Sequence, residues 1–237
     1  MSDWTLWAGI GSAALLLWGL WSLDRACRRA NRTAWGISWL NWIDGLNRIF
    51  CMRYHRLNAT GLRLPAEGPV IVAANHISGL DPLLLVASSR RPLRFLIARE
   101  QYRRPALKWL FKAMGCIPVD RRGRPERAMR AAARALEKGE VVALFPHGKI
   151  HLPSDPPVRL KGGAVRLARL VNCPITPARI NGVRAQGTIF RAIVLRGRAR
   201  VESFHPISVE GREEKEVLEE LADIIEGRLE KRDTAPI

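Results

Sequence analysis

Apolar and polar positions alternate along the chain in short blocks from Val70 onward. Brief apolar runs, typical of buried strands, are separated by segments with an apolar residue every three or four positions, typical of helices. The pattern predicts strands over 70–75, 93–98, 116–120, 141–145 and 175–180, a terminal hairpin over 192–195 and 199–204, and helices over 81–88, 105–114, 127–138, 163–170 and 213–229. This alternation predicts an α/β domain with a mostly parallel central sheet flanked by helices.

The start of the chain is apolar and carries no charged residue over positions 4–23. A helix of that length spans the ~30 Å hydrocarbon core of a bilayer. Asp3 precedes the segment and a cluster of arginines over 25–32 follows it, which favours an uncleaved transmembrane anchor over a secretory signal peptide. The positive-inside rule then places the remainder on the cytoplasmic side of the inner membrane. The alternative is a helix buried in the protein core.

A second N-terminal segment predicts an amphipathic helix rich in aromatic residues. Steps of three and four positions bring its apolar residues onto one face: Trp35, Trp39, Trp42, Leu46, Ile49 and Phe50. Such a helix lies in the headgroup plane with its aromatic side down, or docks on the domain core. We therefore expect membrane helices over residues 1–58, preceding an α/β domain over residues 59–237.

Charge changes the picture of the partner. The 237 residues include 39 Lys and Arg against 22 Asp and Glu, a net charge of +17, which indicates an anionic partner or surface. Nucleic acid, anionic lipid and a phosphorylated substrate all fit this charge, and a GC-rich genome also favours arginine codons. Residues 90–130 alone carry 13 basic and 3 acidic side chains.

The four cysteines have neither the spacing of a zinc site nor that of a disulfide framework.

The segment Asn75-His76-Ile77-Ser78-Gly79-Leu80-Asp81 is the strongest candidate for chemistry. It follows a predicted buried strand and runs into a helix, and strand ends in α/β sheets are where sites are built. A carboxylate that holds one imidazole nitrogen lets the other act as a base, which makes His76 and Asp81 a candidate catalytic pair. On the alternative interpretation His76 is a hydrogen-bonded core residue and Asp81 a helix N-cap.

Four blocks in order resemble the 1-acylglycerol-3-phosphate acyltransferase family. They are the 75–81 segment, Gly115-Cys116-Ile117-Pro118-Val119-Asp120-Arg121, Phe145-Pro146-His147-Gly148 and Cys173-Pro174-Ile175-Thr176-Pro177. The resemblance implies an acyltransferase of phospholipid metabolism, without a cofactor, that takes an acyl group from acyl-CoA or acyl-carrier protein. It implies that His76 deprotonates the hydroxyl of a lysophospholipid while Asp81 orients the imidazole, and that lysophosphatidic acid is the default acceptor.

The resemblance also assigns substrate binding, with one departure from the family pattern. Arg121 would bind the acceptor phosphate, and Pro146 and Gly148 belong to the third block, where Lys149 or Lys161 would take an anionic ligand. The family usually has F-P-E-G-T-R-S in this block, whereas this chain has His147 at the acidic position and Ile150 at the arginine position. His147 and His151 have the spacing of a metal pair on a helix, but Pro146 and Gly148 disfavour a helix, so we expect no metal site.

The sequence leaves several functions open. An acyltransferase for a lysolipid without a glycerol phosphate headgroup is the close alternative, because of the altered third block. A catalytically silent, basic lipid-binding module with the same fold is the alternative from another class. A nucleic-acid binder is disfavoured by the apolar N-terminal segment and by the absence of a nucleic-acid motif, so we expect the bilayer and no nucleic acid as partner.

Overall fold

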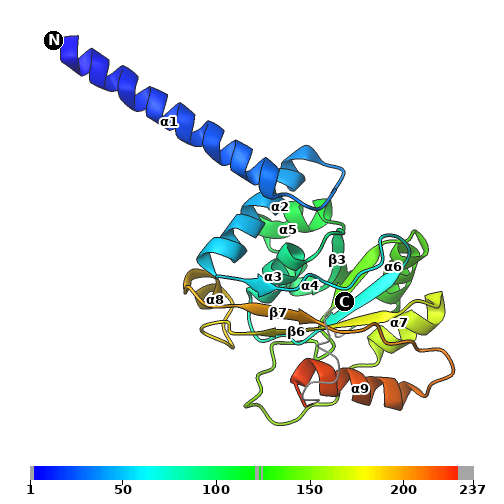
Figure 1. The fold of residues 1–237 in the computed structure, drawn as a ribbon. Coiled ribbons are helices and arrows are strands. Elements are labelled where there is room, and N and C mark those ends of the chain that lie inside the picture. Colours follow the sequence, from blue (N-terminus) through cyan, green and yellow to red (C-terminus); the bar gives the residue numbers. More distant parts are fainter. Residues whose placement is uncertain (1–2, 121–122, 124, 229–237) are drawn as a thin grey trace.

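One seven-stranded sheet forms the centre of the protein. The computed structural model describes residues 3–120, 123 and 125–228 (Figure 1). Its strands are β1 (Asn58–Ala59), β2 (Val70–Ala74), β3 (Leu93–Ala98), β4 (Ile117–Val119), β5 (Val141–Leu144), β6 (Ile175–Asn181) and β7 (Arg200–Ser203). Their order is β1-β7-β6-β2-β5-β3-β4, and among these described strands only β6 and β7 run antiparallel. The predicted α/β fold with a mostly parallel sheet is confirmed.

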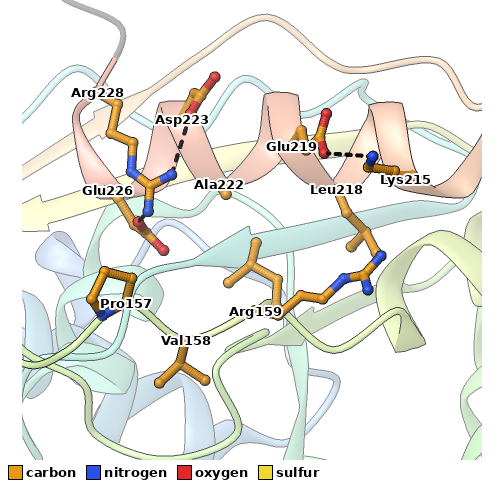
Figure 2. Close-up of a pocket in the computed structure, with 11 residues that line it drawn as sticks. Pro157, Val158, Arg159, Lys215, Leu218, Glu219, Ala222, Asp223, Glu226 and Arg228 are labelled. Atoms are coloured by element: carbon orange, nitrogen blue, oxygen red, sulfur yellow. Dashed lines mark ion pairs between the residues drawn. The ribbon is translucent and has the colours of Figure 1, made fainter.

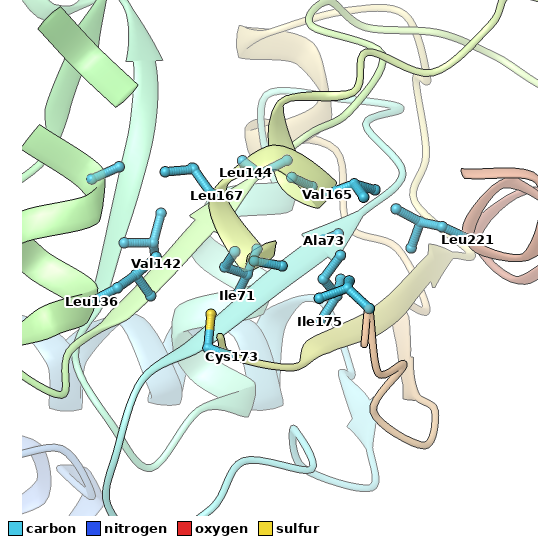
Figure 3. Packing of buried hydrophobic residues seen from close by; sticks show 14 of the residues in the cluster. Ile71, Ala73, Leu136, Val142, Leu144, Val165, Leu167, Cys173, Ile175 and Leu221 are labelled. Atoms are coloured by element: carbon cyan, nitrogen blue, oxygen red, sulfur yellow. The ribbon is translucent and has the colours of Figure 1, made fainter. Parts of the chain in front are cut away.

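Helices cover both faces of this sheet. They are α3 (Asp81–Ser88), α4 (Arg99–Tyr102), α5 (Pro105–Ala113), α6 (Pro125–Glu137), α7 (Gly163–Val171), α8 (Phe190–Val194) and α9 (Glu214–Glu226). Alternate residues of β2 belong to two separate cores: Ile71 and Ala73 pack with α6, α7 and α9 (Figure 3), and Val70 and Val72 pack with α3. All five residues of β2 are buried, which is why this strand is a continuous apolar run in the sequence.

Two helices and a π-helical turn precede the sheet: α1 (Asp3–Ala30), α2 (Ser38–Ile49) and η1 (Phe50–Tyr54). α1 projects away from the domain as a single straight rod (Figure 1). The apolar stretch 4–23 is therefore helical. Within the part of the chain that the structure describes, however, no helix has both the length and the apolarity to cross a membrane, so the predicted transmembrane helix is not confirmed.

α2 docks on the domain through its polar side. Asp44 and Arg48 are buried, with Arg48 Nε 2.6 Å from Asp44 Oδ2. The Arg48 guanidinium also donates to the carbonyls of Ala87 (2.7 Å) and Ser89 (2.5 Å), at the C-terminal end of α3 where carbonyls have no helical partner. Trp39 on the opposite side is 41% exposed. α2 therefore docks on the domain core, one of the two alternatives that the sequence left open, and Arg48 makes the contact because carbonyls at the end of α3 lack helical partners.

The predicted strand over 192–195 is wrong, because these residues lie in and after α8, a single helical turn. β7 pairs with β6 and β1, so it does not form the predicted hairpin with residues 192–195. The carbonyls of Ile193 and Val194 accept hydrogen bonds from His55 Nε2 (3.0 Å) and Tyr54 Oη (2.5 Å). Side chains from η1 and the residue after it thus replace the strand partner that the sequence pattern had indicated. The predicted boundary at 58/59 stays a prediction.

Candidate active site

The loop that follows β2 is fixed to the neighbouring strand by Asn75. Its side-chain Nδ2 donates to the Ile180 carbonyl (2.8 Å) and its Oδ1 accepts from the Ile180 N–H (2.7 Å). Asn75 therefore continues the β2–β6 hydrogen bonding for one more step with its side chain, where the β2 backbone turns away. The next residue, His76, is held at the carboxyl end of a central strand, the expected location for a site.

The Asp81 carboxylate accepts hydrogen bonds from the loop that precedes it. Its Oδ2 accepts from the backbone N–H groups of Ile77 (2.6 Å) and Ser78 (2.8 Å), and its Oδ1 accepts from Ser78 Oγ (2.6 Å). The side chain is fully buried. Asp81 makes no capping bond to α3, so the alternative interpretation as a helix N-cap is not supported, because the carboxylate points back toward residues 76–78.

His76 completes this cluster. Its Nδ1 lies 2.8 Å from Asp81 Oδ2, and since the oxygen already accepts two N–H groups, Nδ1 carries the proton and Nε2 is the basic nitrogen. The imidazole stacks on Phe145 at 4.1 Å between ring centroids, which fixes its plane. Its side chain keeps 19% of its surface exposed. The arrangement is an oriented imidazole that is partly accessible to solvent.

The third sequence block folds against this pair. The His151 N–H donates to the His76 carbonyl (2.7 Å), and the Lys161 N–H donates to the Pro146 carbonyl (3.1 Å). Gly148 has a φ of +74°, and a Cβ there would lie 2.6 Å from Lys161 Nζ, so the lysine side chain passes over this glycine. The structure thus brings together Pro146, Gly148 and Lys161, while Lys149 is exposed on the same loop.

His147 contacts α9. Its Nε2 lies 3.1 Å from Glu226 Oε1, and its ring stacks on His151 at 4.5 Å between centroids. Burial lowers the pKa of His147, and the Glu226 hydrogen bond opposes that shift only in part. Its Nδ1 is buried and has no hydrogen-bond partner among the described residues. No sequence motif indicated Glu226, which lies 79 positions further along the chain.

Glu226 also lines a pocket of about 350 Å³ between α9 and the 157–160 segment. Figure 2 shows Arg228 beside Glu226 and Asp223 at one end of the pocket, and Lys215 beside Glu219 at the other. Neither His76 nor Asp81 lines it. Each acidic residue that lines this pocket forms an ion pair with Lys215 or Arg228.

The second block is described only in part. Arg121 lies outside the described residues. Asp120, which precedes it, forms an ion pair with Arg99 of α4, with 3.0 Å between Nη1 and Oδ2. The block is therefore tied to α4, the helix that follows β3.

The cysteines do not supply a nucleophile to the site. Burial raises the pKa of Cys51 to about 12 and those of Cys116 and Cys173 to about 11, which keeps these thiols protonated at neutral pH. Among the residues that the structure describes, no group of three or more His, Cys, Asp or Glu side chains is arranged to hold a metal ion.

Comparison with known proteins relates this geometry to a family. Residues 56–181 match the family model described as Acyltransferase. The chain is 26% identical to the 1-acyl-sn-glycerol-3-phosphate acyltransferase of Bacillus subtilis over 129 residues, which are 54% of this chain and 63% of that protein. It is 31% identical to the N-acylphosphatidylethanolamine synthase of Arabidopsis thaliana over 123 residues, 48% of this chain and 43% of that protein. The matched part is less than two thirds of either relative's length.

The fold has a solved counterpart. The crystal structure of a 1-acyl-sn-glycerophosphate (LPA) acyltransferase from Thermotoga maritima superimposes with a TM-score of 0.65 at 20% sequence identity. The superposition covers 80% of this chain and 79% of that chain. At this identity the likeness concerns the fold.

Proposed function

The chain belongs to the Acyltransferase family, and from this premise we propose that it transfers a fatty acyl group from acyl-CoA or acyl-carrier protein to the hydroxyl of a lysophospholipid. The observation that carries the proposal is the His76–Asp81 pair at the carboxyl end of β2, with a 2.8 Å contact and a buried carboxylate. The matched region, residues 56–181, contains both side chains. A silent lipid-binding module has no need of an oriented base that is partly open to solvent.

In the proposed reaction His76 Nε2 takes the proton of the acceptor hydroxyl. The oxygen forms a bond to the thioester carbonyl carbon, the C–S bond breaks, and the proton passes from Nε2 to the departing thiolate. Asp81 stabilises the imidazolium in between and keeps the proton of Nδ1 in place. Ser78 and the two backbone N–H groups hold the carboxylate, so the pair is oriented before the substrate arrives.

Lysophosphatidic acid is the acceptor that we propose first, with Lys149 and Lys161 as candidate partners of its phosphate. Both lysines are exposed, and Lys161 passes over Gly148 in the third block. A second candidate is a lysolipid with another headgroup. It is favoured by the residue at position 147, a histidine buried against Glu226 where the family usually has an acidic residue.

We propose the cytoplasmic face of the inner membrane as the location. Exposed aromatic side chains support contact with a bilayer: Trp39 of α2 packs on Trp109 of α5 with 5.2 Å between ring centroids, and Trp109 is 53% exposed. Tryptophan is enriched where a membrane meets water. A bilayer is also where a lysophospholipid resides.

The test is thiol release by the detergent-solubilised protein supplied with palmitoyl-CoA and a panel of lysolipids. His76→Ala is expected to lower the rate by about 10²–10⁴-fold, the usual contribution of a general base. His205→Ala is the matched control, because His205 is an exposed histidine bonded to Arg63 on another face. Turnover of His76→Ala equal to that of the control would refute the assigned base. Transfer only to lysolipids lacking a phosphomonoester would select the second candidate.

A further inference from the structure

The helical turn α8 exposes its large apolar side chains to solvent and buries its small one. Its small residue, Ala192, is fully buried, whereas Phe190 is 68% and Val194 67% exposed. These two large apolar side chains are four positions apart and therefore share one face of the turn. Ile189 and Leu195, immediately outside the turn, are exposed as well. A folded domain leaves such a group uncovered when something else covers it.

The exposed apolar group extends onto η1. Tyr54 Oη donates to the Val194 carbonyl (2.5 Å), which joins the end of η1 to the end of α8. Met52 and Tyr54 are themselves exposed. Together these residues form what we call the α8 surface: Met52, Tyr54, Ile189, Phe190, Val194 and Leu195.

Arginines flank this surface. Arg53, Arg191 and Arg196 are exposed, and within the described residues none of them forms an ion pair. An apolar centre with a cationic rim matches the acyl boundary of a bilayer below anionic headgroups. Six side chains are also far fewer than the roughly 20–30 residues per side of a stable protein interface.

The α8 surface is attached directly to the candidate active site. The Gly79 N–H donates to the Thr188 carbonyl (3.0 Å), and the Gly187 N–H donates to the Ile77 carbonyl (2.8 Å). A Cβ at Gly79 would lie 2.7 Å from Ile189 Cα, so the two loops touch backbone to backbone. Whatever the α8 surface contacts therefore lies beside the loop that carries His76.

We propose that the α8 surface is a second membrane-contact surface, separate from α1 and α2, that inserts Phe190 and Val194 into an anionic phospholipid bilayer beside the active-site loop. It rests on the membrane location of the proposed function, but not on the chemistry assigned to His76. Its consequence is that a lysolipid enters the site from the leaflet itself, since the loop and the lipid boundary lie side by side.

The test measures insertion of the α8 surface into lipid vesicles, using the whole protein. Phe190→Cys carries an environment-sensitive fluorophore, and the four native cysteines are buried and so protected from labelling. With vesicles of phosphatidylcholine and phosphatidylglycerol, we expect a blue shift and quenching by a lipid-borne quencher. Glu219→Cys on the exposed side of α9 is the matched control and is expected to show neither. Equal water exposure of the two labels in vesicle-bound protein would overturn the proposal.

Two further arms exclude other occupants. Shielding of the label by palmitoyl-CoA without vesicles would assign the surface to the donor's acyl chain, and shielding that rises with protein concentration would assign it to a second copy; either overturns the proposal. Arg191→Gln and Arg196→Gln are each expected to weaken binding to the anionic vesicles by about fivefold and not to weaken binding to neutral ones. Insertion of the label with no acyl transfer would leave this proposal standing and refute the proposed function alone.

Discussion

Replacing Asp81 by Asn removes the negative charge beside His76 and keeps nearly the same side-chain shape. The amide has nearly the shape of the carboxylate, so Asn fits the space that Asp81 fills. Ile77 and Ser78 both donate a backbone N–H to Oδ2, so the amide oxygen is expected to occupy that position and the amide nitrogen to face Ser78 Oγ, which then accepts. The geometry around His76 is preserved and the negative charge is lost.

The size of the effect follows from that charge. A carboxylate and an imidazolium with charge centres about 4 Å apart attract each other by about 4 kcal/mol at an effective dielectric constant near 20. We therefore expect kcat for thiol release to fall about a thousandfold in Asp81→Asn. Ser78→Ala keeps the charge and removes the bond to Oδ1, so it is expected to lose about 1.5–3 kcal/mol of folding stability and to retain most of its kcat.

Thiol release and urea denaturation of the two variants, side by side, provide the assay. A kcat for Asp81→Asn within tenfold of the unmodified protein, at a folding stability close to that of Ser78→Ala, would refute the reasoning. It would mean that the carboxylate shapes the loop and contributes no charge to the transition state.

Three more outcomes follow from contacts described above. Arg48→Met strands the buried Asp44 carboxylate and is expected to lower the free energy of unfolding by about 3–5 kcal/mol in urea titration, with recovery when Asp44→Leu is added. Gly79→Ala pushes a Cβ into the backbone of Ile189, so thermal melting is expected to show a loss of about 1–3 kcal/mol together with reduced turnover. Because burial lowers the pKa of His147, the unfolded chain binds its proton first as the solution is acidified, and denaturation at a series of pH values is expected to show stability falling below about pH 6.5 and levelling off below the folded pKa. His147→Phe is expected to flatten that decline.

The sheet was predictable because its central strands are buried on both faces. A strand such as β2, with all five residues buried, must be a continuous apolar run, and such runs are readable without knowing their neighbours. The contact between His76 and Asp81 was predictable for a similar reason, since the two residues lie five positions apart in one turn. Their catalytic roles stay a prediction.

The remaining features depend on partners far away in the sequence. The run at 192–195 is too short to show a period, and its conformation is fixed by hydrogen bonds from residues about 140 positions earlier. The docking side of α2 is set by carbonyls at the end of α3, which hydrophobic patterning does not represent. Glu226 reaches His147 across 79 positions, and nothing near either residue in the sequence connects them.

The place of β2 in the sheet also determines how long this strand waits for its neighbours while the chain is being synthesised. β2 pairs with β5 on one side and with β6 on the other, and Asn75 bonds to Ile180, 105 residues later. At roughly 5–20 residues per second, a ribosome needs roughly 5–20 s to make that intervening chain. Throughout this interval at least one edge of β2 has no neighbour, and an open edge of apolar residues invites pairing with other chains. A nascent chain that ends before Ile180 therefore has His76 but lacks the β6 backbone that holds the His76 loop through Asn75.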